Sequence, residues 1–331
     1  MPTHAPVHQI KPGWSAVDIP GLAGRTAVVT GASSGIGYQI ARQLAAHGAH
    51  VILASRDADR AAQAARAITA ESPAASTEAR LLDLGSLESV RRFAAGLSDR
   101  HSELDMLVNN AGISGGPRRE TSDGFEAHLG VNYLGHFALT GLLLPALLAR
   151  PGSRVITMSS GLAAQARINF DDLNSRHTYR MTSAYGQSKL AGLVFAVELG
   201  RRARAGGAGL ISLAAHPGAA RTGLVSGKRA EWGRRRDATE TLVRLVQLLF
   251  AQSAARAALP ALYQATAHAA DSARYVGTRR HMHGYPAICA YPPAALSQET
   301  ATRLWQASQD LTGITYDSLP PSPLASSSPR P

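Results

Sequence analysis

Residues 30–37 read TGASSGIG and connect an apolar run, residues 26–29, to a segment of helical periodicity at residues 38–46. The apolar run predicts a strand, and the periodic segment predicts a helix. A strand, a glycine-rich turn and a helix start together make a phosphate-binding site, because the first N–H groups of a helix have no partner inside the helix. A glycine turn without a ligand is the alternative interpretation.

The individual residues of this turn suit a pyrophosphate. Gly31 allows a tight turn out of the strand, and Gly35 and Gly37 remove side chains that would hold a phosphate away from the backbone. The hydroxyls of Ser33 and Ser34 add hydrogen-bond donors. The glycine spacing is G-x-x-x-G-x-G, which differs from the commoner dinucleotide pattern G-x-G-x-x-G.

The composition is that of a globular enzyme. The chain has 331 residues, of which 45% are hydrophobic and 31 are glycine, and this excludes a fibrous or disordered protein. The one cysteine, Cys289, excludes an intramolecular disulfide and favours a reducing compartment. Residues 1–24 lack the apolar core of a signal peptide, and the longest apolar run, residues 137–149, is too short to cross a bilayer. We therefore expect a cytoplasmic protein without a membrane span.

The net charge of +11 raises the question of a nucleic-acid partner. The basic residues are scattered, however, with only Arg234–Arg236 forming a run, and aromatic residues make up 5% of the chain. A solvated arginine-rich surface together with an anionic cofactor accounts for this pattern better than nucleic-acid binding.

Strand and helix patterns alternate up to about residue 215 and weaken beyond it. The predicted strands are 26–29, 50–55, 80–83, 105–109, 154–158, 210–214 and a short one at 273–276. The predicted helices are 38–46, 57–70, one from 86, 125–150, 185–204, 237–251 and 254–269. Since crossovers between parallel strands are right-handed, we expect an α/β fold: a single-domain, Rossmann-like, doubly wound parallel sheet with helices on both faces.

The domain organisation follows from the same pattern. We expect an N-terminal extension at 1–23, a dinucleotide-binding catalytic domain at 24–285, and a C-terminal extension at 286–331 that ends in a disordered Pro/Ser tail. Residues 219–236, rich in Gly, Ala and Arg, are predicted to form a mobile lid over the carboxyl ends of the strands.

The end of the second predicted strand bears on the choice of cofactor. An acidic residue there would bind the ribose hydroxyls of NAD(H), but this chain has Ser55 followed by Arg56. A serine and a guanidinium can bind a 2′-phosphate through charge-assisted hydrogen bonds, which favours NADP(H) over NAD(H). An exposed arginine at a turn is the alternative.

Two further strand ends carry suitable residues. Asp83 ends the third predicted strand and is within reach of an adenine amino group. Asn110, Ala111 and Gly112 follow the fourth strand and are small enough for a ribose and nicotinamide to approach the backbone. The carboxyl ends of parallel strands lie at one edge of the sheet, so these residues are expected to share one site.

Tyr185 and Lys189 are four residues apart at the start of a predicted helix, so they share one face. A phenol has an ordinary pKa of about 10, and a nearby ammonium group lowers it by favouring the phenolate. The pair could therefore exchange protons at neutral pH. Such pairs are also common as surface residues of a helix.

Six motifs occur in an order that resembles the short-chain dehydrogenases/reductases, over residues 24–276. They are TGASSGIG at 30–37, NNAG at 109–112, VN at 131–132, SSG at 159–161, YGQSK at 185–189 and HPG at 216–218. Further motifs are similar to the retinol-dehydrogenase and protochlorophyllide-reductase-like branch. These are LDLGSL at 82–87, SDGFE at 122–126, NYLGHF at 132–137 and FDDLN at 170–174.

The resemblance implies a role for individual residues. Tyr185 would be the proton donor or acceptor, Lys189 its activator and a ribose ligand, Ser160 the hydrogen-bond partner of the substrate carbonyl, and Asn132 the residue that maintains a proton relay. The cofactor-binding residues would be Gly31, Ser33, Ser34, Gly35, Ile36, Gly37, Arg56, Asp83, Leu84, Asn110, Ala111, Gly112, Tyr185, Lys189, Pro217, Gly218 and Thr222.

The expected function is that of an NADP(H)-dependent oxidoreductase, which transfers a hydride between nicotinamide and a carbonyl or alcohol substrate with Tyr185 as general acid/base. The branch suggests a lipophilic substrate. The alternatives are reduction of a C=C bond and a non-catalytic, cofactor-binding regulatory protein. No metal is expected, since His4, His8, His281 and His283 lack partners at metal-ligand spacing. A homodimer or homotetramer could form on the helix faces of 125–150 and 185–204.

Overall fold

The computed structural model describes residues 10–218, 252–268, 275–278 and 284–321. Several sequence predictions fall outside these ranges. They are the lid at 219–236 with Thr222, the helix at 237–251, most of the Pro/Ser tail, and His4, His8, His281 and His283.

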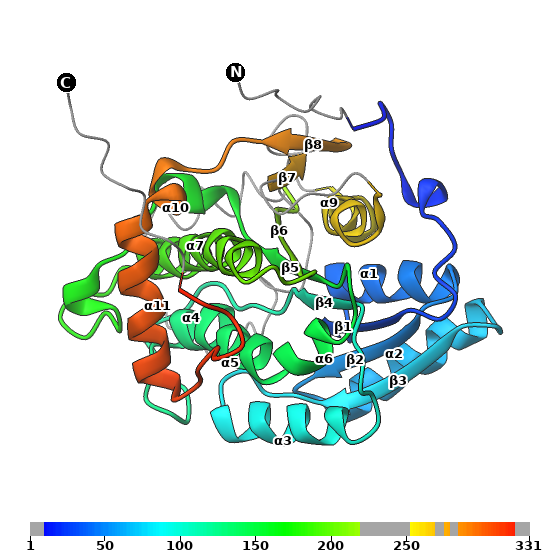
Figure 1. The fold of residues 1–331 in the computed structure, drawn as a ribbon, viewed down its shortest axis with the longest axis horizontal. Coiled ribbons are helices and arrows are strands. Elements are labelled where there is room, and N and C mark those ends of the chain that lie inside the picture. The colour runs from blue at the N-terminus through cyan, green and yellow to red at the C-terminus, as the bar shows by residue number, and fades with distance from the viewer. Residues whose placement is uncertain (1–9, 219–251, 269–274, 279–283, 322–331) are drawn as a thin grey trace.

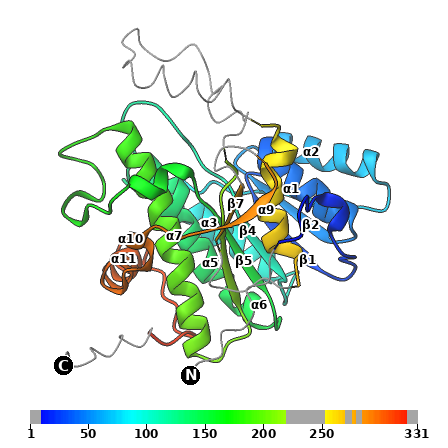
Figure 2. The same cartoon turned by 90° about the horizontal axis from the view of Figure 1, so that it is seen from above.

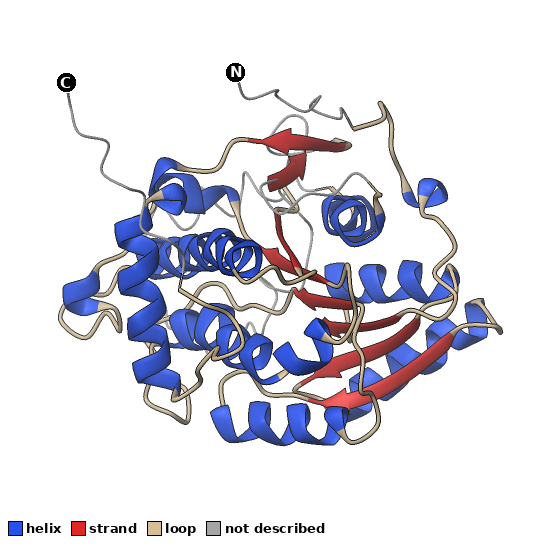
Figure 3. Ribbon diagram, viewed as in Figure 1, coloured by secondary structure: helices blue, strands red, loops and turns tan. Residues whose placement is uncertain are grey.

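An eight-stranded sheet forms the centre of the molecule, in the order β3-β2-β1-β4-β5-β6-β7-β8 (Figures 1 and 3). The strands are β1 (Thr26–Thr30), β2 (His50–Ser55), β3 (Ser76–Leu81), β4 (Met106–Asn109), β5 (Arg154–Met158), β6 (Ile211–Ala215), β7 (Tyr275–Thr278) and β8 (Pro286–Cys289). Strands β1 to β7 are parallel, and β8 pairs antiparallel with β7. This confirms the predicted doubly wound α/β sheet.

Helices cover both faces of the sheet (Figure 2). One apolar core contains side chains of α1 (Gly35–Ala46), α2 (Ala58–Glu71) and α9 (Ala254–Thr266). The core on the other face contains side chains of α3 (Leu87–Ser98), α4 (Ala127–Leu129), η2 (Gly130–Leu134), α5 (Gly135–Leu142), α6 (Leu144–Leu148), α7 (Met181–Ala205), α10 (Pro293–Leu296) and α11 (Gln298–Thr312). Three 3-10 turns complete the described elements: η1 (Ala16–Asp18), η3 (Gly161–Gln165) and η4 (Phe170–Asp172).

Burial explains which strands the sequence revealed. Strands β1 and β2 are buried on both faces and appear in the sequence as continuous apolar runs. Strand β3 lies at the sheet edge, is only half-buried and reads STEARL. The predicted third strand at 80–83 is therefore wrong: the real strand is Ser76–Leu81, and its polar residues gave no apolar signal.

The predicted helix at 125–150 is also wrong in its continuity. The chain forms α4, then a π-helical turn, η2, and only then α5 and α6. Pro145 lies in the first turn of α6, where its missing N–H costs no helical hydrogen bond. The π turn contains Asn132 and therefore matters for the site.

The C-terminal segment forms elements that the sequence did not indicate. Strand β8 adds to the sheet immediately after the predicted domain end at residue 285, and α11 packs against α7. The Trp305 ring lies 5.8 Å from that of Phe195 and 4.7 Å from that of Tyr316, and the Arg202 guanidinium lies 4.1 Å above it. The Tyr316 hydroxyl donates to the Phe137 carbonyl oxygen at 2.6 Å.

This packing bears on self-association. Phe137 on α5 and Phe195 on α7 belong to the helix faces that the sequence suggested for a homodimer or homotetramer, and both are buried beneath Trp305 and Tyr316 of the same chain. Association through those faces stays a prediction, and it would have to use the parts of them that α11 leaves exposed. No helix in the described ranges is long and apolar enough to cross a membrane.

The packing of α11 predicts the effect of Trp305→Ala. Trp305 is 3% exposed, so removing its ring leaves a cavity against Phe195 and Tyr316. We expect the free energy of unfolding, measured with urea, to fall by about 3–5 kcal/mol. Leu296→Ala, at a side chain 48% exposed, is the control and should cost less than about 1 kcal/mol. Equal effects of the two substitutions would show that α11 is not part of the folded core.

Candidate active site

The glycine turn between β1 and α1 has an open helix start. Gly31 and Gly35 have φ values of +67° and +60°, in the region that favours glycine. The Gly31 N–H donates to the Ala54 carbonyl oxygen at 2.8 Å, which fixes the turn to the end of β2. Ser34 is the N-cap of α1, but its side chain makes no capping hydrogen bond. The first N–H groups of α1 are therefore not capped by that side chain, as an anion site requires.

Gly37 has a packing role that the sequence analysis did not assign to it. A methyl group at Gly37 would collide with the Gly31 carbonyl oxygen and would lie 2.5 Å from Asn110 Nδ2. The same close approach is seen at Gly31, where a methyl group would lie 3.0 Å from the Ala111 Cα. The glycines thus let the turn lie directly against the residues that follow β4.

Thr30 joins these two segments and was missed by the sequence analysis. Its hydroxyl oxygen accepts hydrogen bonds from the N–H groups of Asn110 and Ala111, both at 2.9 Å. The Asn110 side chain donates to the Thr30 carbonyl oxygen at 2.8 Å. The hydroxyl also lies 2.9 Å from Nε2 of the buried His136. A threonine at the end of a strand carries no distinctive sequence signal, because its role depends on contacts far along the chain.

His136 belongs to the same buried network. Burial lowers the pKa of its imidazole to about 3, with the nearby Lys189 charge acting in the same direction. The ring is therefore neutral at physiological pH. Its Nδ1 lies 3.2 Å from the Asn132 carbonyl oxygen, so it connects the glycine turn to the π turn η2.

The π turn places Asn132 between two parts of the site. The Asn132 amide oxygen accepts from the Ile113 N–H at 2.7 Å, and its amide nitrogen donates to the Ile113 carbonyl oxygen at 3.1 Å and to the Ser188 hydroxyl at 3.0 Å. Asn132 therefore holds the segment after β4 against α7. Ser188 is a further contributor that the sequence did not single out.

Gly112 marks the point where the predicted catalytic residues meet. A methyl group there would lie 3.1 Å from Asn132 Oδ1 and 3.2 Å from Lys189 Nζ. Lys189 Nζ donates to the Met158 carbonyl oxygen at 3.2 Å and lies 6.0 Å from the centre of the Tyr185 ring. Four elements, β4, η2, β5 and α7, contribute to this arrangement.

The two serines after β5 point to different partners. Ser159 is buried, and its hydroxyl donates to the Lys189 carbonyl oxygen at 3.0 Å, so it supports α7. Ser160 is half-buried, its hydroxyl accepts from the Leu162 N–H at 3.3 Å, and its interaction with the Tyr185 side chain acts to lower the pKa of that phenol, against the effect of burial. Of the pair, it is therefore Ser160 whose side chain faces Tyr185.

The ionisation of the Tyr185–Lys189 pair differs from the sequence expectation. Burial lowers the pKa of Lys189 to about 8. Burial also raises the pKa of Tyr185, and the hydrogen bond with Ser160 only partly opposes this. In the chain alone the pKa of Tyr185 therefore lies above its ordinary value, opposite to the direction expected from Lys189, because burial of the phenol outweighs the effects that lower its pKa.

The remaining predicted cofactor residues surround this centre at the carboxyl ends of the strands. The Ser55 hydroxyl, buried at the end of β2, donates to the Ser33 hydroxyl at 3.2 Å, and Arg56 beside it is exposed. Asp83 lies two residues past β3 and accepts from the Gly85 N–H at 2.9 Å. Ile36 and Leu84 are buried supports. Pro217 and Gly218 follow β6, and the Pro217 carbonyl oxygen accepts from Gln252 at 2.7 Å.

The segment between β5 and α7 is held in place beside the site. The Asp172 carboxylate accepts from the N–H groups of residues 176–178 at 2.6–3.1 Å. Gln187 on α7 binds both Asn169 and Leu173, and the Tyr179 hydroxyl donates to the Gly116 carbonyl oxygen at 3.0 Å. This segment is therefore attached to both α7 and the chain after β4.

The residues present fit a nicotinamide dinucleotide. The turn at 31–37 offers an uncapped helix start for the pyrophosphate, and Gly112 leaves open the space that a side chain would take up next to Lys189. Tyr185 and Ser160 provide two hydroxyl groups on the same side. Such an arrangement can bind a dinucleotide and exchange a proton with an oxygen atom.

Comparisons with known proteins agree with this geometry. A model of the family described as short chain dehydrogenase matches residues 25–232. Human retinol dehydrogenase 13 is 40% identical over 306 residues, which cover 92% of this chain and 89% of the relative. Mouse polyprenol dehydrogenase is 40% identical over 299 residues, which cover 89% of this chain and 86% of the relative.

Solved structures agree as well. An uncharacterised protein from Mycobacterium paratuberculosis has 41% identity and a TM-score of 0.75, covering 92% of this chain and 99% of its own. A short chain dehydrogenase from Burkholderia cenocepacia in complex with NADP has 26% identity and a TM-score of 0.58, covering 78% of this chain and 96% of its own.

The burial of Lys189 predicts a stability effect that is independent of turnover. Its pKa is about 8 in the folded chain and 10.5 when unperturbed, so the unfolded chain binds the proton more tightly. Below pH 8 the buried ammonium therefore costs folding free energy, and this cost disappears as the pH rises from 8 to 10.5. We expect Lys189→Met to raise the free energy of unfolding by about 1–3 kcal/mol at pH 7 in the cofactor-free protein.

Urea unfolding at neutral and at alkaline pH measures this effect. The stability gain from Lys189→Met should shrink as the pH rises toward 10.5. Lys11→Met is the matched control, since the Lys11 side chain is 69% exposed, and it should change stability little at either pH. A Lys189→Met protein that is less stable than the wild type at neutral pH would contradict the assignment of a costly buried charge.

Proposed function

Because the chain belongs to the short-chain dehydrogenase/reductase family, in its retinol-dehydrogenase-like branch, we propose that it transfers a hydride between NADP(H) and a lipophilic alcohol or carbonyl compound. The observation that carries the proposal is that Asn132 and Lys189 meet at Gly112, with Tyr185 one helical turn before Lys189 and Ser160 interacting with Tyr185. The residues before Gly112 contact Gly31 and Gly37 in the turn that starts α1.

The proton chemistry follows from the hydroxyl groups. In carbonyl reduction, the Tyr185 hydroxyl donates its proton to the substrate oxygen, and in alcohol oxidation it accepts one. Ser160, whose side chain interacts with that of Tyr185, donates to the same oxygen and stabilises its developing negative charge. A nicotinamide cofactor supplies or accepts the hydride when bound.

Burial keeps Tyr185 protonated for this role, and Lys189 and Asn132 complete its surroundings. The phenol of the chain alone has a raised pKa, so it favours the protonated form that a reductive step consumes. Lys189 extends from α7, donates to the Met158 carbonyl oxygen and lies beside Gly112, where it would also hold the ribose hydroxyls of the cofactor. The hydrogen bond from Asn132 to Ser188 holds the π turn η2 against α7 next to Lys189, and a proton could return to Tyr185 through this region.

The choice of NADP(H) over NAD(H) rests on the end of β2. β2 ends at Ser55 and Arg56 follows it, so neither position carries a carboxylate. The next residue, Asp57, uses its carboxylate to cap α2, where it accepts from the Arg60 N–H at 3.0 Å. Arg56 is exposed and can form a charge-assisted hydrogen bond to that phosphate, while the Ser55 hydroxyl lies beside Ser33. The structural relative from Burkholderia cenocepacia, which is in complex with NADP, supports the choice.

A lipophilic substrate is suggested by the names of the relatives, which include retinol and polyprenol dehydrogenases. The segment between β5 and α7 leads into the helix that carries Tyr185. It includes Leu162, which is 42% exposed. An exposed apolar side chain at that place suits a substrate with an extended hydrocarbon part.

Tyr185→Phe tests the proposed reaction. Without the phenolic hydroxyl no proton reaches the substrate oxygen, so we expect kcat for reduction of retinal and long-chain aldehydes to fall at least about a hundredfold. The Kd for NADPH, measured by fluorescence, should stay within about twofold. Tyr285→Phe is the matched control, since its ring is 41% exposed and lies over Arg256, and it should leave both quantities unchanged.

The other outcomes discriminate between functions. Undiminished turnover in Tyr185→Phe would show that another group transfers the proton. Oxidation of NADPH with enones but not with aldehydes or ketones would replace the proposal with C=C reduction. Binding of NADPH without turnover on any of these substrates would favour a regulatory protein.

Arg56→Gln tests the cofactor preference. Losing one charge-assisted hydrogen bond should weaken NADPH binding by about 10–100-fold and leave NADH binding unchanged. Arg66→Gln, at an exposed position on α2, the helix that follows Arg56, is the control and should change neither Kd. Tighter binding of NADH than NADPH by the wild-type chain would overturn the preference.

A further inference from the structure

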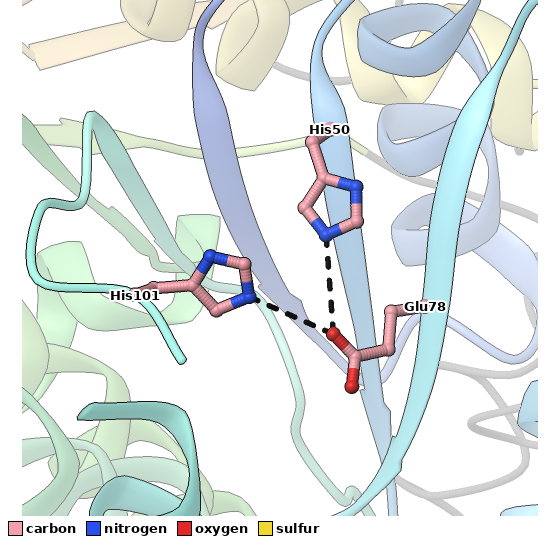
Figure 4. Close-up of side chains that lie close together, drawn as sticks. All are labelled: His50, Glu78 and His101. Atoms are coloured by element: carbon pink, nitrogen blue, oxygen red, sulfur yellow. Dashed lines mark ion pairs between the residues drawn. The ribbon is translucent and has the colours of Figure 1, made fainter. Parts of the chain in front are cut away.

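A cluster of two histidines and one glutamate lies outside the candidate active site (Figure 4). His50 comes from the start of β2, Glu78 from β3, and His101 from the chain just after α3. His50 Nε2 and His101 Nε2 lie 3.9 Å and 3.7 Å from the same oxygen, Glu78 Oε2. All three potential ligand atoms are within 4.8 Å of one another.

The fold itself produces this arrangement. In the parallel pairing of β2 with β3, His50 lies opposite Ser76, and Glu78 is two residues further along β3 and so on the same face of the sheet. His101 is fixed at the end of α3, where its N–H donates to the Leu97 carbonyl oxygen at 2.9 Å. The cluster therefore joins the edge strand to its neighbour and to the helix that covers them.

A hydrogen bond from outside the cluster orients the His50 ring. His50 Nδ1 lies 2.7 Å from the Ser76 hydroxyl oxygen, which can accept a hydrogen bond from the Nδ1–H. In that tautomer the lone pair of Nε2 faces Glu78. An outer partner on the second ring nitrogen is typical of histidines that bind metals.

Two arginines contact one oxygen of the Glu78 carboxylate and leave the other to the histidines. Arg80 Nε donates to Oε1 at 2.7 Å, and Arg100 Nη1 lies 3.6 Å from the same oxygen. Both arginines contact Oε1, so the other oxygen, Oε2, is the one directed at the two imidazoles.

We propose that His50, Glu78 and His101 bind one divalent transition-metal ion, with zinc as the representative case and water as the fourth ligand. Two imidazole nitrogens and a carboxylate oxygen are a common set for an open tetrahedral zinc site. The side chains of all three residues are 21–29% exposed, so an ion can enter. Neighbouring ligand atoms of a tetrahedral zinc lie about 3.4 Å apart, which small side-chain rotations would achieve here.

The metal would act on structure rather than on the reaction. His50 begins β2 and Ser55 ends it, so the cluster lies about 16 Å from the cofactor edge of the sheet along the strand. A bound ion would cross-link β2, the edge strand β3 and the end of α3. The inference therefore stands independently of the proposed enzymatic activity.

The test is calorimetric titration of the full-length, EDTA-treated and dialysed protein with zinc chloride. We expect one equivalent of zinc to bind with a micromolar Kd and to raise the melting temperature. His50→Gln and His101→Gln should each weaken this binding by more than about tenfold. His47→Gln is the matched control, since that half-buried histidine is the C-cap of α1 and its ring Nδ1 lies 2.8 Å from the Gln43 carbonyl oxygen, and this variant should bind zinc as the wild type does.

Arg100→Gln distinguishes zinc binding at this cluster from an indirect effect of the histidine substitutions on the folded structure. The Arg100 side chain is 69% exposed and repels a cation near Glu78, so its removal should tighten zinc binding by a few fold. Circular dichroism of each variant without metal checks that it is folded. An unchanged zinc affinity in both His50→Gln and His101→Gln would assign the metal to other histidines and overturn the proposal, as would the absence of binding by the wild type.

Discussion

The contact between the end of β1 and the end of β4 is the constraint on which the site depends. The Thr30 hydroxyl accepts from two successive N–H groups after β4, and Gly31 and Gly37 allow the two segments to touch. A buried, neutral His136 continues this network to the π turn that contains Asn132. The glycine turn at 31–37 and the π turn η2 are thus one connected unit, and neither can shift without breaking hydrogen bonds in the interior, which are costly to leave unmade.

The second feature is the cost of burying polar groups where chemistry takes place. Lys189 keeps its ammonium in a buried position with the Met158 carbonyl oxygen as a partner, and Tyr185 is harder to ionise than a free phenol. Both shifts arise from desolvation, and an anionic cofactor would counteract the shift of Lys189 because it favours the ammonium. The site is therefore less favourable for stability than a fully apolar one, as is common where function requires a charged group in a buried place.

The C-terminal segment changes the outer layer of the molecule. Helix α11 lies on the outer side of α7 (Figure 1). Its Trp305 packs against Phe195 of α7 and Phe137 of α5, and Tyr316 of the chain after it packs against Phe137, so an aromatic cluster joins α11 to the helices that cover the sheet. The same helix covers apolar surface on α5 and α7 that would otherwise be available for association. Its stabilising effect and its effect on self-association have the same physical origin, the burial of large aromatic side chains.

The sequence by itself determined the doubly wound sheet, the phosphate turn at 30–37 and the pairing of Tyr185 with Lys189, because buried parallel strands, glycine turns and a four-residue helical spacing are local patterns. It misplaced the polar edge strand β3 and missed the π turn at Asn132, since edge strands lack an apolar signal and a π turn depends on what it packs against. Only the tertiary structure decided that Thr30 and His136 tie the site together, that α11 covers α7, and that the residues of β2, β3 and the end of α3 form one cluster. These are contacts between residues far apart along the chain, and their energies appear only once the chain is folded.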